Sequence, residues 1–443
     1  MLPAVGIIAC SVYVIILCIF IVQFDCPVWG YLGHECHISS PYWFNICIIL
    51  LLMLLLLMIQ YQKKHDILIN LWLTFSIILF ISPNIALYLA GSGDIYFTIT
   101  LLNIISLGFI PVLTATCAIR VPSLNFPTIV RRFFAPNFVL LLLLSLTVIF
   151  IASKQGYPSF FSLDDGIYLQ RLSARKNEGE IVNYLALLTN NILFPLAFYI
   201  SFHTRNLRLG IVSIISILFV FSYAAFRSFV VSSAVLFLFS FFNKESSVKS
   251  PNIVNVRGLG LALVAVICLL SITTVSIDSN PFSLTLGSLV TRNLVTPAID
   301  NAKYIQYFEN HHYFMLRDVN AIGPVMQWLT DGFAQGSLQD SKGFTLGSYY
   351  FSNTTNLNAP LWSSGYADFG LLGYLIYPSV VLFLYRLIQS RILLINRPEV
   401  LGLLYPYSVI LILALNEASI NGVMLGYGLL PVFVSVHLMS PRL

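Results

Sequence analysis

The chain has 443 residues, of which 58% are hydrophobic and only 9% are charged. A soluble globular protein carries about 25% charged residues, so this chain has too little polar surface to cover a water-soluble body. Its mean hydropathy of +0.86 indicates that its solvent is lipid. The net charge of +5 comes from scattered basic residues that form no run or aromatic-flanked stripe, which argues against nucleic acid as a partner.

Apolar runs predict about twelve transmembrane helices, because one span needs about 20 apolar residues. The runs lie at about 4–24, 42–61, 67–90, 95–119, 133–152, 181–202, 209–226, 228–242, 258–277, 369–385, 401–416 and 420–439. The first run lacks a basic leader and a clear small-residue cleavage site, so we expect a retained span rather than a secretory signal. Residues 1–443 are therefore expected to form a single all-α, polytopic integral membrane domain.

The distribution of basic residues predicts the orientation. Placing the N-terminus in the cytoplasm also puts 14 of the 23 Lys and Arg residues there, as the positive-inside rule requires. Both termini are then cytoplasmic, and two long loops, at about 153–181 and 277–367, lie on the outer face. Loops of this length between packed spans are usually functional or form a small extra domain.

The larger outer loop contains two contrasting patterns. From Leu294 to Phe308 apolar positions recur every three to four residues, which predicts an amphipathic helix. Gly and Asn cluster at about 332–347 and 352–358, which predicts irregular chain.

Two cysteines lie together in the first polar loop, while the other five lie in apolar runs and are expected to pack there. Cys26 and Cys36 would form a disulfide if this loop faces an oxidising compartment. Two free thiols are the alternative.

Three arginines of the smaller loop and the membrane edge are candidate anion ligands. Arg227 lies between two short apolar runs, where a cation is costly unless it pairs or reaches the surface. Its guanidinium fork matches phosphate oxygens, although it could simply anchor a tight turn. Arg171 and Arg175 would share one helix face, and their partner would be a phosphorylated lipid or acidic residues of the same loop.

The larger loop carries further polar candidates. Arg292 opens the expected amphipathic helix, and His311 and His312 follow Glu309. A histidine outside the membrane can act as a general base at neutral pH, although a histidine pair in a loop is often only surface. The spacing of His, Cys and acidic residues matches no metal site, so no metal cofactor is expected.

The end of this loop has the composition of a sugar site. Asn356, Asn358, Trp362 and Tyr366 offer amide hydrogen bonds to hydroxyl groups and aromatic faces to a sugar ring. Asp368 follows at the start of an apolar run, where a carboxylate also favours a helix N-terminus. Capping that helix is its alternative role.

Several of these segments resemble a known family. The Asn-rich stretch that leads into Tyr366–Gly373, with Asp-Phe-Gly at its centre, resembles the corresponding segment of bacterial oligosaccharide repeat-unit polymerases, the Wzy-type O-antigen polymerases. The turn around Arg227 is similar to theirs, as is an outer loop carrying Tyr168 and Arg171 ahead of a span with Pro195. The similarity in architecture covers nearly the whole chain.

The resemblance implies a glycosyltransferase with a GT-C-like fold in the bacterial inner membrane, its long loops facing the periplasm. Such an enzyme transfers a glycan from undecaprenyl pyrophosphate onto another lipid-linked repeat unit. The implied partners are this lipid-linked oligosaccharide, membrane lipid and a chain-length regulator. The family is thought to work without metal.

The resemblance also implies roles for the candidate residues. Cations would stabilise the charge that develops on the pyrophosphate, and those expected there are Arg171, Arg175, Arg227 and Arg292. His312 or Asp368 would accept the proton of the attacking hydroxyl, with His311 and Glu309 as substitutes. An O-antigen ligase that uses the same donor is one alternative, and a twelve-span transporter or flippase for lipid-linked oligosaccharides is the other.

Overall fold

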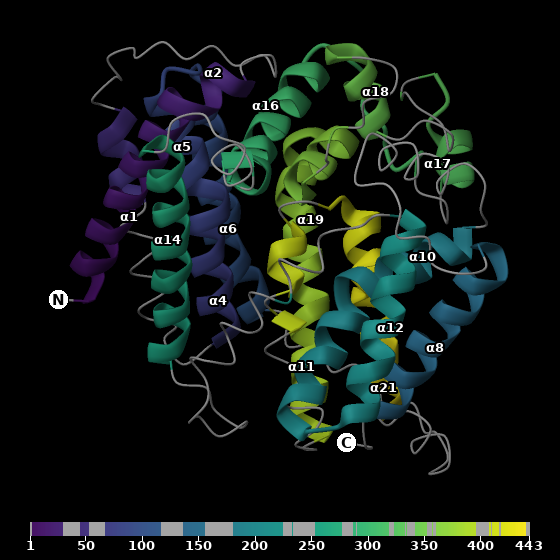
Figure 1. Ribbon diagram of the computed structural model, residues 1–443. Helices are drawn as coiled ribbons and strands as arrows, with labels where there is room; N and C mark the ends of the chain where they lie inside the picture. The colour runs from purple at the N-terminus through teal and green to yellow at the C-terminus, as the bar shows by residue number, and fades with distance from the viewer. Residues whose placement is uncertain are drawn as a thin grey trace. The chain divides into compact units, whose positions relative to one another are not determined.

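The computed structural model contains helices and no strands in the part of the chain that it describes (Figure 1). The described residues are 2–29, 45–52, 67–116, 136–155, 180–224, 253–276, 287–318 without 289, 323–332, 342–351, 360–395, 407–415 without 409, 418–439, and single residues at 233, 334 and 357. The chain forms two compact units. Unit 1 comprises residues 1–118, 252–382 and 415–420, and unit 2 comprises 119–251, 383–414 and 421–443.

Unit 1 contains the larger predicted loop, 277–367, with all of the helices described in it. Its helical segments are α1 (Leu2–Phe20), η1 (Ile21–Asp25), α2 (Cys26–Trp29), α4 (Ile67–Ser76), η3 (Ile77–Ile81), α5 (Ser82–Leu89), α6 (Ile95–Thr116), α14 (Ile253–Ser276), η5 (Thr291–Val295), α16 (Thr296–Phe308), α17 (Gly323–Leu329), α18 (Lys342–Tyr350) and the first part of α19 (Leu361–Ile395). Within the unit, α1 packs against α5 and α14, and α5 packs against α6.

Unit 2 is built around a helical pair, α8 and α12. Its helical segments are α8 (Pro136–Gln155), α10 (Glu180–Leu188), η4 (Thr189–Leu193), α11 (Phe194–Thr204), α12 (Leu207–Ala224), the end of α19, η6 (Gly422–Gly426) and α21 (Leu429–Met439). The hydroxyls of Thr147 and Thr189 are 2.9 Å apart, and Ser216 Oγ donates to the carbonyl of Leu144 over 3.2 Å. Hydrogen bonds from small hydroxyl side chains between apolar helices are typical of packing inside a membrane.

Proline explains a recurring irregularity in these helices. A π-helical turn stands directly before Cys26-Pro27, Ser82-Pro83, Phe194-Pro195 and Thr296-Pro297. Proline cannot donate the helical hydrogen bond, and its ring clashes with the carbonyl four residues earlier. Widening the preceding turn to a π-helix relieves the clash and lets the helix continue.

Four described helices are long and apolar enough to cross a membrane. Their apolar windows are Ile8–Asp25, Trp72–Leu89, Leu185–Phe202 and Leu361–Arg391. Shorter apolar helices cover Ile95–Gly108, Leu140–Ser153, Leu207–Phe221 and Leu263–Val275. These helices indicate a membrane-embedded protein and confirm the predicted helical class, while the number of about twelve spans stays a prediction. Nearly all of the expected run at 228–242 lies outside the described residues.

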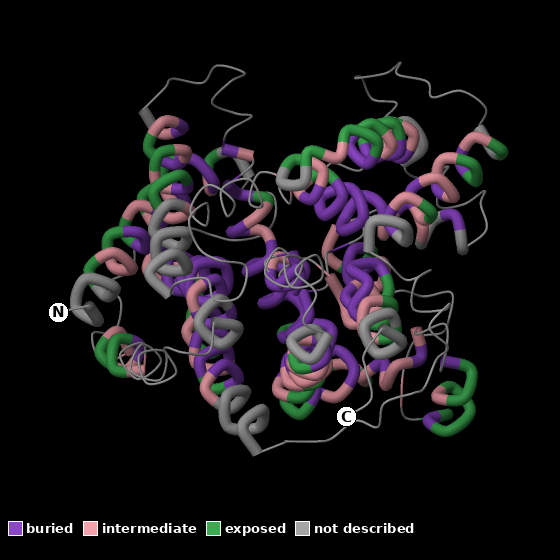
Figure 2. The backbone as a smooth tube through the Cα atoms, turned by 90° about the horizontal axis from the view of Figure 1, so that it is seen from below, coloured by how far each residue is buried: buried purple, intermediate pink, exposed green. Residues whose placement is uncertain are grey.

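Several of these helices carry large apolar side chains on an exposed face. Figure 2 shows helices that are buried along one side and exposed along another. The exposed side chains include Ile8, Ile149, Phe202 and Leu269, each at least 60% exposed. Exposed apolar surface on long helices is what lipid would cover.

The described parts of the larger predicted loop are more helical and more buried than their sequence predicts. The helix expected from Leu294 to Phe308 is present as the end of η5 and α16, but α16 is buried on nearly all sides. Its buried residues include Lys303, and burial lowers the pKa of this amine to about 8, although Asp300 acts in the opposite direction. The expectation of irregular chain is wrong at residues 342–347, which begin α18, because tertiary contacts outweigh its two glycines.

Candidate functional site at the break in α19

The segment that resembles the polymerases contains a sharp break in a long helix. Within α19, Phe369 has φ −140° and ψ 20°, and Gly370 has φ 61° and ψ −142°. The second conformation is essentially restricted to glycine, because a side chain would clash with the backbone. A Cβ at Gly370 would also lie 2.8 Å from the hydroxyl oxygen of Tyr313. Glycine therefore permits both the break and the close approach of Tyr313.

Two further glycines let the helix arms on either side of the break touch. A Cβ at Gly365 would overlap the carbonyl oxygen of Gly373, and a Cβ at Gly373 would overlap that of Gly365. Small residues allow this direct contact between backbones. The pair explains why the break is tightly folded rather than a gentle bend.

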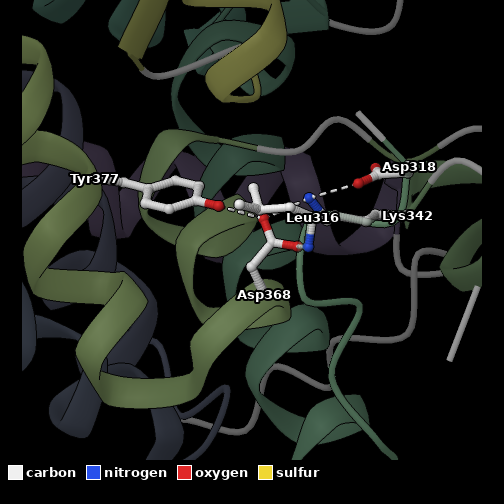
Figure 3. A network of polar contacts seen from close by, with 5 residues as sticks. All are labelled: Leu316, Asp318, Lys342, Asp368 and Tyr377. Atoms are coloured by element: carbon white, nitrogen blue, oxygen red, sulfur yellow. Dashed lines mark hydrogen bonds and ion pairs between the residues drawn. The ribbon is translucent and has the colours of Figure 1, made fainter. Parts of the chain in front are cut away.

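Asp368, immediately before the break, is the centre of a buried polar network (Figure 3). Its Oδ2 accepts from Lys342 Nζ over 2.6 Å and from the hydroxyl of Tyr377 over 2.5 Å, and its Oδ1 accepts from the backbone N–H of Leu316 over 2.9 Å. Lys342 Nζ also lies 3.0 Å from Oδ1 of Asp318. The network thus joins α18 and the chain after α16 to both arms of α19.

The balance of charges favours an ionised lysine. Burial alone would lower the pKa of Lys342, but the nearby carboxylates of Asp368 and Asp318 outweigh it and raise the pKa above its ordinary value. One lysine faces two carboxylates, so the ionised network would carry a net charge of −1. A buried network of charges is stable only while each charge keeps its hydrogen-bonding and ionic partners.

Two residues opposite the break, Met315 and Leu316, have a strained backbone that places a hydrogen-bond donor of the network. Met315 has φ 50° and Leu316 has φ 63°, both in the left-handed region that bulky residues rarely occupy. This conformation directs the N–H of Leu316 to Asp368, while the N–H of Phe314 donates to the carbonyl of Ala367 over 2.8 Å. The surrounding bonds compensate for a strain of about 1–3 kcal/mol per residue.

The turn that precedes this strained segment presents a histidine and an aromatic surface. The ring of His311 stacks on Tyr307 with centroids 3.9 Å apart, and Tyr349 meets both rings edge to face. Nδ1 of His311 lies 2.7 Å from the carbonyl oxygen of Tyr307, which can only accept, so Nδ1 carries a proton. In the neutral ring Nε2 then has its lone pair available.

The structure separates the predicted site residues by burial. Asp368 has no exposed surface, Trp362 is 1% exposed, and Tyr366 is 7% exposed. The indole N–H of Trp362 already donates to Ser106 Oγ over 3.1 Å. His312 and Arg292 are exposed, the latter on η5. Arg171, Arg175, Arg227, Asn356 and Asn358 lie outside the described residues.

Of the two predicted aromatic site residues, Tyr366 lies beside the histidine turn and Trp362 does not. Tyr313, next to His312, meets Tyr366 edge to face with centroids 6.2 Å apart, and it touches the break beside Asp368. Trp362 instead packs between Trp72 and Phe80 inside unit 1. The predicted sugar-binding role of Trp362 and Tyr366 stays a prediction, and this structure gives both of them packing roles.

Sequence reasoning missed the partners of Asp368. Lys342 and Asp318 are charged residues of an outer loop and look like ordinary solvated residues in the sequence, and Tyr377 lies in an apolar run. Only Tyr377 could have been found from the sequence. It lies nine positions after Asp368, and a helix break between the two brings their side chains together. The hydrogen bond from the backbone N–H of Leu316 could not be predicted, because every residue except proline has such a donor.

Two other predictions concern cysteine and metal. Cys26 is disulfide-bonded, while its predicted partner Cys36 lies outside the described residues. In the part of the chain that the structure describes, no group of three or more His, Cys, Asp or Glu side chains is placed to hold a metal ion. The expectation of a metal-independent reaction stays a prediction.

The fold and site define an all-helical, membrane-embedded protein with a buried ionic network at a broken helix. Comparison with protein-family models, with curated proteins and with solved structures finds no match.

Proposed function

We propose that this protein is a bacterial glycosyltransferase of the repeat-unit polymerase type, which transfers a glycan from undecaprenyl pyrophosphate to another lipid-linked repeat unit. One observation carries the proposal. Tyr366–Gly373, the segment that resembles the polymerases, belongs to the long apolar helix α19. Hydrogen bonds from Lys342 and Leu316 to Asp368 hold the loop with the two histidines against this segment. A fixed loop of this kind suits a reaction at the membrane surface.

The chemistry requires a cation for the leaving group and an acceptor for one proton. The bond from sugar C1 to the pyrophosphate oxygen breaks, and a bond from C1 to the acceptor oxygen forms. The pyrophosphate leaves with the electron pair, so it needs stabilising cations rather than a proton. Arg292 is exposed in unit 1, the unit that contains the two histidines, and suits this role. Arg171, Arg175 and Arg227 stay the candidates that the sequence offers for it.

The geometry supports a histidine as the proton acceptor. Both carboxylate oxygens of Asp368 already accept hydrogen bonds, and its lack of exposed surface keeps it from a sugar hydroxyl. His311 has a ring fixed by stacking and a tautomer that leaves Nε2 as an acceptor. His312, which is exposed one position along, is the alternative. In this proposal Asp368 positions the histidine turn.

An exposed aromatic ring beside the histidines supports a sugar substrate. Tyr349 is 61% exposed and its ring centroid lies 5.6 Å from that of His311. Glu309 and Asn310 are exposed on the same turn as His311 and supply hydrogen-bonding groups. Aromatic faces with a few polar groups around them suit sugar rings.

The glycan made by a deletion strain tests the proposal. Without the gene we expect loss of long surface polysaccharide with single repeat units retained on the lipid A core, because ligation does not need polymerisation. Loss of all attached glycan would identify a ligase instead. An unchanged ladder of chain lengths would contradict both.

Variants returned to the deletion strain then locate the chemistry. His311→Ala should leave only single repeats although protein levels are normal, since removal of a general base costs about 100-fold or more in rate. Arg227→Ala should do the same, because the developing charge of the pyrophosphate loses a stabilising cation. His312→Ala is the matched control and should keep a ladder of long chains. The opposite result for the two histidines would assign the base to His312.

A transporter is the second candidate because of the break in α19. Transporters often bind substrate where a membrane helix is interrupted, and the interruption at Phe369–Gly370 lies inside a candidate span. Purified protein with two lipid-linked repeat units distinguishes the two functions. Dimeric glycan formed in detergent indicates the transferase, since transport needs a closed vesicle.

A further inference from the structure

The short helix α17 exposes an apolar face that a water-soluble surface would hide. Val325 is 57% exposed, Trp328 79% and Leu329 54%. These positions follow the i, i+3, i+4 spacing of a single helix face. Gln327 is also exposed but lies between them in the sequence and so points in a different direction. The helix is therefore apolar along one definite face.

This face is held in place by a buried arginine. Arg317 is 6% exposed, and its Nε donates to Thr330 Oγ1 over 2.8 Å. A terminal guanidinium nitrogen of Arg317 also donates to the carbonyl of Thr330 and, over 3.5 Å, to that of Gln327. The positive charge thus satisfies carbonyls at the C-terminal end of α17, where a cation is favoured.

The length and charge of α17 limit what can cover it. Seven residues make a helix of about 10 Å, which cannot cross the hydrocarbon core of a membrane. Its sequence, Gly-Pro-Val-Met-Gln-Trp-Leu, contains no charged residue. Within unit 1 the helix lies in the upper part of the view with α16 and α18, level with the upper parts of α5 and α19 (Figure 1).

We propose that α17 lies in the interface between bilayer and water, with Val325, Trp328 and Leu329 inserted at the level of the headgroups. Tryptophan is enriched at this depth because its apolar ring and its N–H suit the two media. The candidate spans of unit 1 bring a bilayer to the helix, and an uncharged helix needs no anionic lipid. Arg317 and the neighbouring Asp318 connect the inserted helix to Lys342 and the buried network.

Fluorescence quenching in proteoliposomes of zwitterionic lipid tests the insertion. Single cysteines at Trp328→Cys and Gln327→Cys, in full-length protein whose free cysteines are replaced by alanine, carry an environment-sensitive label. We expect a spin label near the lipid headgroup to quench the label at 328 at least several-fold more than at 327, and aqueous iodide to show the reverse preference. The pattern should not change with salt concentration.

Equal iodide quenching at both positions without lipid quenching would overturn the proposal. Shielding from iodide that depends on protein concentration, again without lipid quenching, would overturn it in favour of contact between two copies. Val325→Cys repeats the measurement on the same face if replacing Trp328 prevents folding. A thermal melt of each labelled variant checks that α17 is compared in folded protein.

Discussion

Lys342 connects two carboxylates that are far apart in the sequence, of which Asp368 is fully buried and Asp318 is 11% exposed. Asp318 and Asp368 belong to different segments, and each lies within 3.0 Å of the same ammonium group. The free energy of the network depends on the number of charges, because an unpaired charge loses its hydration without recovering it through a partner. Removing the cation should therefore be worse than removing the cation together with one anion.

The variant Lys342→Met should reduce the free energy of unfolding by about 3–5 kcal/mol, the usual effect of breaking a buried ion pair. The double variant Lys342→Met with Asp318→Asn should recover part of this loss, since one buried charge fewer is left unpaired. Thermal unfolding in detergent measures both. If Lys342→Met melts at the wild-type temperature, the network does not hold the loop against Asp368.

Sequence reasoning singled out Asp368 but not the residues that surround it. A carboxylate before an apolar run predicts a helix cap or a reactive group, and the structure instead shows three hydrogen bonds from distant donors. The roles of Trp362 and Tyr366 were equally hard to infer from the sequence, since aromatic residues are common both in sugar sites and in protein cores. Burial decides between these uses, and burial depends on the whole fold.

At the scale of elements, small residues and prolines determine where helices bend. Pro27, Pro83, Pro195 and Pro297 each follow a π-helical turn, and the break in α19 falls at Gly370. The prolines are visible in the sequence, so the distortions were in principle predictable from the missing N–H donor. The direct contact between the two arms of α19 was not, because it needs both arms in place.

The arms of α19 provide a test of close packing. Gly365→Ala should destabilise the protein by about 1–3 kcal/mol, since the added methyl group overlaps the backbone of Gly373 and requires the arms to separate. Gly108→Ala in α6 is the matched control, because no atom lies within 4 Å of the added Cβ. That control should be neutral or slightly stabilising. Equal melting temperatures for both variants would contradict the close contact at Gly365.

At the scale of the whole molecule, the distribution of basic residues predicts which ends of the helices face outward. The positive-inside rule places the loop with His311 outside and the turn between α11 and α12 in the cytoplasm. The disulfide at Cys26 agrees with an oxidising compartment for the first polar loop. Asn310 and Arg208 are exposed in these two regions and serve as reporters.

A membrane-impermeant maleimide should label Asn310→Cys in intact cells and label Arg208→Cys only after the inner membrane is opened. Both variants are made with the free cysteines replaced by alanine. The expected preference is at least tenfold, because the bilayer excludes a charged reagent. Labelling of Arg208→Cys alone in intact cells would reverse the orientation and move the proposed reaction to the cytoplasm.

The sequence alone determined the helical class, the apolar character of the helices and the helix from Leu294 to Phe308, because these depend on composition and local periodicity. Only the tertiary structure decided that α16 is buried on nearly all sides, that Lys342 pairs with Asp368, and that Trp362 belongs to the core. These outcomes depend on contacts between segments tens to hundreds of residues apart. Local patterns contain no information on which distant side chain fills a given space.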